Sequence, residues 1–153
     1  MLTCSSLLCA IASGAAVTGT VRLTGTERRD RSGVVVWLEP AGVVEGASGT
    51  ARSKARMEQR GKRFVPHVVA IQAGSEVEFP NYDPIFHNAF SNFSGQVFDL
   101  GLYAPGDNRA VRFTRPGVVR VFCNIHPAMS AVIVVLRHPW FAVSNRAGAF
   151  AIP

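Results

Sequence analysis

The stretch GVVRVFCNIHPAMSAVIVVL, residues 117–136, joins two β-strand patterns through a short loop rich in metal-binding side chains. Val119, Val121 and Cys123 occupy alternate positions, so an extended strand places all three on one face. Arg120 lies between them on the other face, which must reach solvent because arginine is rarely buried without a partner. We therefore predict that Cys123 points into the core at the end of this strand.

A thiol, an imidazole and a thioether follow one another in that loop with the same spacing. They belong to Cys123, His126 and Met129, and a further histidine, His87, lies upstream after an apolar strand and a turn. One thiolate, two imidazoles and a weak thioether are the ligand set of a mononuclear blue-copper electron-transfer site. These four residues are therefore candidate ligands of one type-1 copper ion, with another soft metal as the alternative.

The rest of the sequence is typical of antiparallel β structure. Apolar runs rich in Val, Ile and Phe are separated by 14 Gly and 9 Pro, and hydrophobic residues make up 48% of the chain. That content excludes an intrinsically disordered chain, and short strands at regular intervals predict an all-β sandwich without long helices. The expected strands cover residues 17–23, 34–38, 68–71, 76–79, 109–114, 119–123 and 131–136.

Several short motifs resemble those of plastocyanin-like cupredoxins, the type-1 blue copper family, in order and spacing. These motifs are Phe64-Val65-Pro66, Ala73-Gly74, Val77-Glu78-Phe79, Asn81 and His87-Asn88. The Cys–His–Met loop resembles that of amicyanin, and the wider sequence is similar to methylamine-utilisation-like bacterial cupredoxins. The resemblance covers residues 60–136 and implies a Greek-key β-sandwich that carries single electrons. When the copper ligands of that family are carried over by position, the resemblance implies His87, Cys123, His126 and Met129 as the ligands.

Neighbouring residues receive supporting roles as hypotheses. We expect the Asn88 backbone N–H to donate to the Cys123 sulfur and the Asn88 side chain to brace the ligand loop, which Pro127 stiffens. An apolar patch around the edge of His126 is the expected electron port. Its members are Pro84, Ile85, Phe86, Pro127 and Ala128.

Three other polar residues match no ligand position of the family. We interpret His67 as structural, with a second metal site as the alternative. His138 is expected to be a linker residue after the last strand of the sandwich, and Asp83 an ordinary loop residue.

Four segments are expected along the chain. Residues 1–16 are a candidate signal peptide, although no positive charge precedes their apolar run, and the N-terminus of a cytosolic protein is the alternative. Residues 17–59 should form an N-terminal β extension and a basic loop, followed by the cupredoxin domain at 60–136. Residues 137–153 should form a C-terminal β segment. It resembles part of a carboxypeptidase-regulatory-like sandwich, either truncated or folded back as a hairpin on the N-terminal strands.

Cysteine usage favours export to the periplasm or a similar compartment. Removal of the signal peptide would take away Cys4 and Cys9 and leave Cys123 as the one thiol. A lone thiol in an oxidising compartment is explained by metal ligation, and an inert buried cysteine is the alternative.

The net charge of +6 arises almost entirely from Arg52 to Arg63. A solvated turn or short helix explains this basic run most simply, and a docking face for an acidic partner or an anionic membrane surface is the functional alternative. Nucleic acid is disfavoured because no aromatic platform or recognised motif accompanies the charge. No stretch has the roughly 18 apolar residues of a membrane span.

Together these observations predict an exported type-1 copper protein that carries single electrons between redox proteins. It is expected to be a carrier and not an enzyme, because four protein ligands leave no open position for a substrate. A copper storage or delivery protein, and a structural β-sandwich with a vestigial site, are the alternatives. The electron partners, the reduction potential and the oligomeric state are not determined by the sequence.

Overall fold

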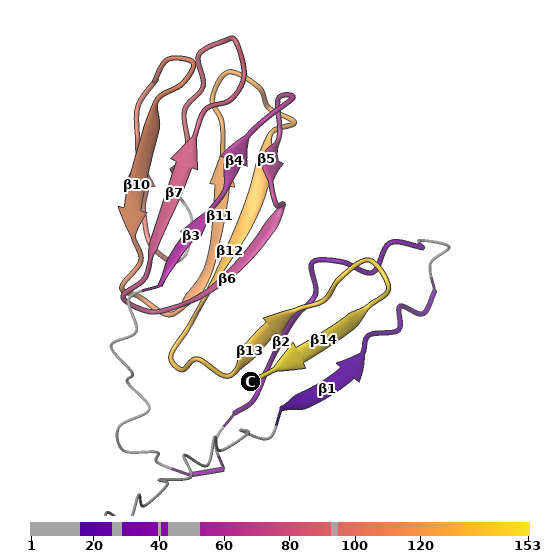
Figure 1. The fold of residues 1–153 in the computed structure, drawn as a ribbon. Coiled ribbons are helices and arrows are strands. Elements are labelled where there is room, and N and C mark those ends of the chain that lie inside the picture. The colour runs from indigo at the N-terminus through magenta and orange to yellow at the C-terminus, as the bar shows by residue number, and fades with distance from the viewer. Residues whose placement is uncertain (1–15, 26–28, 40, 43–52, 93–94) are drawn as a thin grey trace, which may run out of the picture.

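The computed structural model describes residues 16–25, 29–39, 41–42, 53–92 and 95–153, and these residues form strands, turns and loops without a helix. Two packed sheets make up a β-sandwich, and a smaller unit built from the two ends of the chain lies beside it (Figure 1). The predicted all-β sandwich is therefore confirmed. In this part of the chain no helix is long and apolar enough to cross a membrane. Residues 1–15 of the candidate signal peptide lie outside the described residues.

One sheet of the sandwich has five strands in the order β6-β12-β11-β8-β9. They are β6 (Val68–Gln72), β12 (Ser130–Leu136), β11 (Gly117–Phe122), β8 (Phe90–Ser91) and β9 (Phe98–Asp99). β12 runs antiparallel to β11 and parallel to β6. The alternation expected around the cysteine is confirmed, since Val119 and Val121 are fully buried and Cys123 is only 3% exposed, whereas Arg120 is exposed.

The facing sheet has the order β10-β7-β3, with β10 (Asn108–Arg112), β7 (Glu76–Pro80) and β3 (Lys54–Arg56). A two-stranded ribbon of β4 (Glu58–Gln59) and β5 (Phe64–Val65) follows β3. The basic run thus differs from the solvated turn or short helix expected. Its first half is a strand parallel to β7, and fully buried Met57 joins that strand to the ribbon.

The core between the sheets ends at the ligand loop. Phe79, Phe98 and Phe113 form a chain of aromatic contacts with ring centroids 5.8 and 5.7 Å apart. Cys123 and Met129 belong to the same buried cluster. These two candidate ligands are therefore part of the core, and the packing of the two sheets fixes their positions.

The two ends of the chain pair with each other. β1 (Val17–Thr20) is antiparallel to β14 (Ala149–Ile152), and β2 (Val35–Trp37) is antiparallel to β13 (Phe141–Val143). The C-terminal hairpin thus packs back on the N-terminal strands (Figure 1). It lies away from the ligand loop, which is at the other end of the sandwich.

A Tyr103→Phe substitution should lower the free energy of unfolding by about 1–3 kcal/mol. Tyr103 is 1% exposed, its hydroxyl donates to the Phe79 carbonyl at 2.9 Å, and the Gln59 side-chain amide donates to that hydroxyl. Burial raises the pKa of Tyr103, so the proton that serves Phe79 stays in place. Loss of the hydroxyl leaves buried polar groups on both neighbours without this partner.

Urea unfolding of the apoprotein measures this effect. Tyr82→Phe is the matched control, because Tyr82 is 46% exposed and its change should stay within about 0.5 kcal/mol. Equal stability of the Tyr103 variant and the wild type would show that the buried hydroxyl contributes nothing.

Candidate metal centre

Two loops at one end of the sandwich carry the candidate ligands. The loop after β7 ends at His87, whose backbone pairs with Tyr103 through reciprocal hydrogen bonds of 3.3 and 2.9 Å. Buried Asn81 shapes this loop, because its side-chain amide donates to the Ile85 carbonyl at 2.9 Å and its Oδ1 accepts from the Asp83 N–H at 3.0 Å. His87 is consequently held rigidly and is fully buried.

The second loop joins β11 to β12. The Cys123 N–H donates to the Met129 carbonyl at 3.2 Å, and the Met129 N–H donates to the His126 carbonyl at 2.8 Å. These bonds close a tight turn that turns Met129 back into the core, where it is 1% exposed. The turn thus brings both ends of the Cys–His–Met motif to the end of the sandwich.

The structure brings the three strongest candidate ligands together. His87, Cys123 and His126 offer ligand atoms that all lie within 4.8 Å of one another. The Cys123 Sγ lies 3.9 Å from His87 Nδ1, and the two imidazole rings meet edge to face with centroids 4.9 Å apart. The 3.9 Å sulfur–nitrogen separation is one that two bonds of about 2.0–2.3 Å to a shared ion can span.

The chemistry of this cluster fits copper. His126 Nδ1 is buried and has no hydrogen-bond partner among the described residues, an arrangement that is costly unless another group occupies the space beside the lone pair. A thiolate with two imidazoles suits Cu(I) and Cu(II), whereas hard cations prefer oxygen ligands. His87, Cys123 and His126 would hold the ion, and Met129 is the candidate weak thioether ligand.

Asp83, which the sequence indicated only as a loop residue, contacts the candidate metal centre. Its Oδ2 lies 2.8 Å from His87 Nε2. A carboxylate only accepts, so His87 carries its proton on Nε2 and turns the lone pair of Nδ1 toward Cys123. The four-residue spacing to His87 in a loop interrupted by proline was the available signal. That spacing alone does not reveal that the carboxylate is buried.

The other side of the Asp83 carboxylate is bound by a turn of the β4–β5 ribbon. The Gly61 N–H donates to Oδ1 at 2.5 Å and the Lys62 N–H donates to Oδ2 at 2.8 Å. Burial raises the pKa of Asp83, but these bonds and the one from His87 outweigh it, so the pKa lies below the usual value. The carboxylate therefore stays charged at neutral pH and couples this turn to His87.

The Asn88 side chain is hydrogen-bonded to the ligand loop. Its Oδ1 accepts from the Asn124 backbone N–H at 2.8 Å, which ties the loop after β7 to the first residue after the cysteine. The hydrogen bond from the Asn88 backbone to the Cys123 sulfur, and the stiffening role of Pro127, stay predictions.

The residues expected at the electron port lie on the surface around the cluster. Pro84, Ile85, Phe86 and Ala128 are exposed, with Phe86 56% exposed, and Pro127 is exposed beside partly buried His126. Exposed Ile125 extends this apolar surface. Among the four candidate ligands, His126 is the one that is partly exposed, because His87, Cys123 and Met129 are buried.

Two other histidines lie apart from the cluster. His67 is exposed between β5 and β6. His138 is only 6% exposed and stacks on Trp140 with ring centroids 5.4 Å apart. His138 was expected to be a linker residue, and it is instead a buried packing residue.

No protein-family model and no curated protein sequence matches the chain. Solved structures do match it. A purple cupredoxin from Nitrosopumilus maritimus is 24% identical, with a TM-score of 0.50 over 54% of this chain and 99% of its own. An amicyanin mutant in its oxidised state is 17% identical, with a TM-score of 0.52 over 59% of this chain and 89% of its own.

A copper-containing nitrite reductase from Thermus scotoductus SA-01 is 28% identical, with a TM-score of 0.52 over 55% of this chain. The chain matches only 22% of that reductase. The shared architecture is therefore that of the small copper-protein fold, which occurs alone or within a longer chain. The chain is a cupredoxin by fold, and its His–Cys–His cluster fits a type-1 copper site.

Proposed function

We propose that the protein binds one type-1 copper ion through His87, Cys123, His126 and Met129 and carries single electrons between redox proteins. The observation that carries the proposal is the convergence of one thiol and two imidazoles, with mutual separations within 4.8 Å, at the end of a cupredoxin sandwich. Copper bound there would supply a reversible one-electron couple. The protein supplies rigid positions for the ligands and a path to the surface.

The packing of the site supports rapid electron exchange. His87 is fixed by Asp83 at one nitrogen, and the Cys–His–Met loop is closed by its own backbone bonds and by Asn88. Because ligands held this way move little, the geometry would change little when the oxidation state changes. Partly buried His126 lies among exposed apolar residues, which favours it as the exit for the electron.

We propose a carrier and not an enzyme, because four protein ligands would leave no position for a substrate. The nitrite reductase among the similar structures does not argue against this, since the chain spans a small part of it. We also propose export to the periplasm, where metal ligation would account for the single described thiol, Cys123. Redox proteins with an acidic docking surface are the proposed partners, given the net charge of +6.

Visible spectroscopy and cyclic voltammetry of the copper-loaded protein test this function. One equivalent of Cu(II) should give an intense visible band from thiolate-to-copper charge transfer, together with a reversible couple. Weak colour, ready copper release and no reversible couple would indicate storage or delivery instead. Failure to take up copper would indicate a structural β-sandwich with a vestigial site.

A further inference from the structure

The basic run of the sequence divides into two halves with different surroundings. In the first half, Lys54 lies 3.6 Å from Glu76 and 3.7 Å from Glu78, and Arg56 lies 3.1 Å from Glu78. Each side chain is thus paired with at least one carboxylate on the neighbouring strand, and Glu76 also lies 3.6 Å from Arg112. This half of the run serves the pairing of β3 with β7.

The second half is a hairpin turn beside the candidate metal centre. The Arg60 N–H donates to the Arg63 carbonyl at 2.9 Å, and the two central residues, Gly61 and Lys62, have φ angles of 61° and 56°. These are the left-handed conformations of a tight two-residue hairpin. Lys62 and Arg63 are exposed, and neither forms an ion pair with a described residue. Arg60, in contrast, pairs with Glu58 at 3.3 Å.

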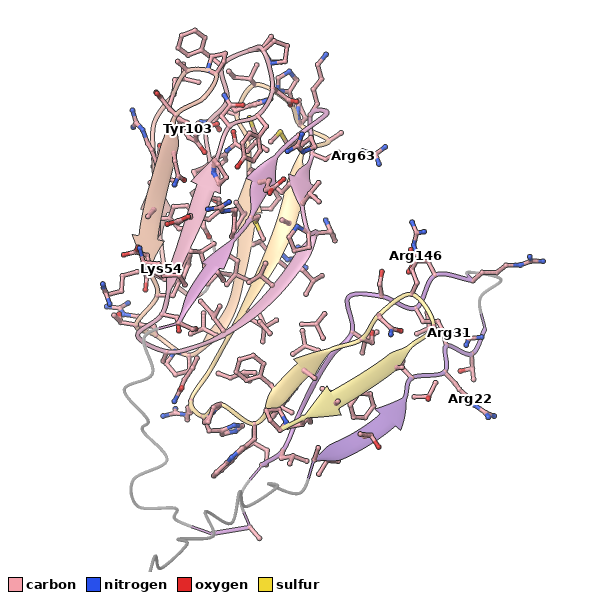
Figure 2. All side chains as sticks on the ribbon, in the orientation of Figure 1. Arg22, Arg31, Lys54, Arg63, Tyr103 and Arg146 are labelled. Carbon is pink, nitrogen blue, oxygen red and sulfur yellow. The ribbon has the colours of Figure 1, made fainter. Side chains whose placement is uncertain are left out.

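The two halves lie at opposite ends of the sandwich. Figure 2 shows Arg63 at the same end as Tyr103, whose backbone pairs with His87, and Lys54 at the other end. Lys62 and Arg63 are therefore available to a partner that approaches the ligand loop. Lys54 and Arg56 are distant from that loop and paired with carboxylates.

The surface beside the ligand loop extends this charge. Arg63, His67 and Ala128 line one shallow hollow, and His67 and Arg120 line the next. Arg120 is exposed and has no ion-pair partner among the described residues. We call Lys62, Arg63 and Arg120 the cationic rim. Ala128, a member of the apolar patch, lies at its border, so one partner can contact the rim and the electron port together.

The rim has a fixed position relative to the metal centre. Adjacent N–H groups of Gly61 and Lys62 form an anion-binding concavity for the Asp83 carboxylate, which also binds His87. The turn cannot move far without breaking these hydrogen bonds, which are partly buried. A docking surface that is preorganised in this way loses little conformational entropy when a partner binds.

We propose that the cationic rim is the recognition surface for an acidic redox protein, which it orients so that the partner's redox centre faces the apolar patch over His126. This inference rests on the proposed electron-carrier function and adds which of the basic residues recognise the partner. A protein is favoured over an anionic membrane because the unpaired cations border the electron port, whereas Lys54, Arg56 and Arg60, the other described basic residues of the run, lie beside carboxylates.

A binding experiment tests the rim independently of electron transfer. Native cytochrome c is basic, and its succinylated form is acidic with the same haem, so the two are matched probes. Titration of the ¹⁵N-labelled protein with the succinylated form should shift amide resonances of Lys62, Arg63 and Ala128, and the native form should not. Shifts centred on Lys54 and Arg56, or none at all, would overturn the proposal. Binding to anionic phosphatidylglycerol vesicles without binding to succinylated cytochrome c would overturn it in favour of a membrane surface.

A kinetic experiment then tests the consequence for electron transfer. In Lys62→Glu/Arg63→Glu, the second-order rate constant with succinylated cytochrome c should fall about tenfold at low salt and rise with native cytochrome c. The control, Arg22→Glu/Arg115→Glu, changes the net charge equally and should have little effect. Both control residues are exposed, and Figure 2 shows Arg22 in the smaller unit, just beyond the end of β1. Equal effects of the two variants would mean that net charge acts alone and would refute the rim.

Voltammetry separates this inference from the function on which it rests. Absence of a reversible couple would refute the electron carrier, while the resonance shifts would still decide whether the rim binds acidic proteins. A reversible couple with rates that are indifferent to Lys62 and Arg63 would leave the carrier intact and refute the rim.

Discussion

Copper-loaded Cys123→Ser should lose the intense visible absorption of the oxidised protein completely. The colour of a type-1 site arises from charge transfer between a thiolate and copper, and the serine hydroxyl is a hard, weak donor that cannot replace it. Cys123 is the free cysteine of the described residues and lies 3.9 Å from His87 Nδ1, so no other described sulfur ligand of the same kind can substitute. The measurement is a Cu(II) titration followed by visible and electron paramagnetic resonance spectra.

A variant at Met129, the candidate thioether ligand, provides the matched control. Met129→Leu conserves the volume of a buried side chain and leaves the thiolate in place. It should keep the colour and change the reduction potential, because a weak axial ligand tunes the potential without supplying the main copper bond. Circular dichroism of both apoproteins should match the wild type. Colour that persists in Cys123→Ser would remove this cysteine from the site.

The local pattern around Cys123 was sufficient to predict its environment. Alternation of Val119 and Val121 with Arg120 fixed which face the thiol occupies, and the structure buries that face. A shift of one residue in the pairing register would exchange the two faces of this strand and bury Arg120, so the observed register is strongly favoured. This is why the fold and the thiol's position could be read from a short stretch of sequence.

The first half of the basic run was not predictable in this way. Lys54 and Arg56 look solvated in the sequence, since their neutralising partners, Glu76 and Glu78, lie on another strand. Asp83 was missed for a related reason. The sequence indicates a loop residue, and only the fold shows that Asp83 is 7% exposed and that its carboxylate is bound by three N–H groups. Contacts between distant segments decide both cases, and local patterns do not contain them.

The second large effect is expected from Asp83→Asn, which should lower the stability of the apoprotein by roughly 2–3 kcal/mol. The carboxylate accepts from Gly61 N–H, Lys62 N–H and His87 Nε2–H. An asparagine of the same shape has one acceptor oxygen, and its amide group would direct donors at a backbone N–H or at the imidazole. At least one buried donor therefore loses its partner. The midpoint of urea unfolding measures the loss.

Asp83→Asn should also weaken Cu(II) binding by about 10–100-fold, because an outer hydrogen bond orients a ligand imidazole and raises its basicity. Competition with a chelator of known affinity measures this change. Asp99→Asn is the control, since Asp99 is exposed and its Oδ1 accepts from the Gly101 N–H at 2.8 Å, a bond that an asparagine side chain can keep. If Asp83→Asn lost stability but bound copper as tightly as the wild type, Asp83 would be a structural anchor of the turn alone. Unchanged values of both quantities would show that His87 is held by the fold without it.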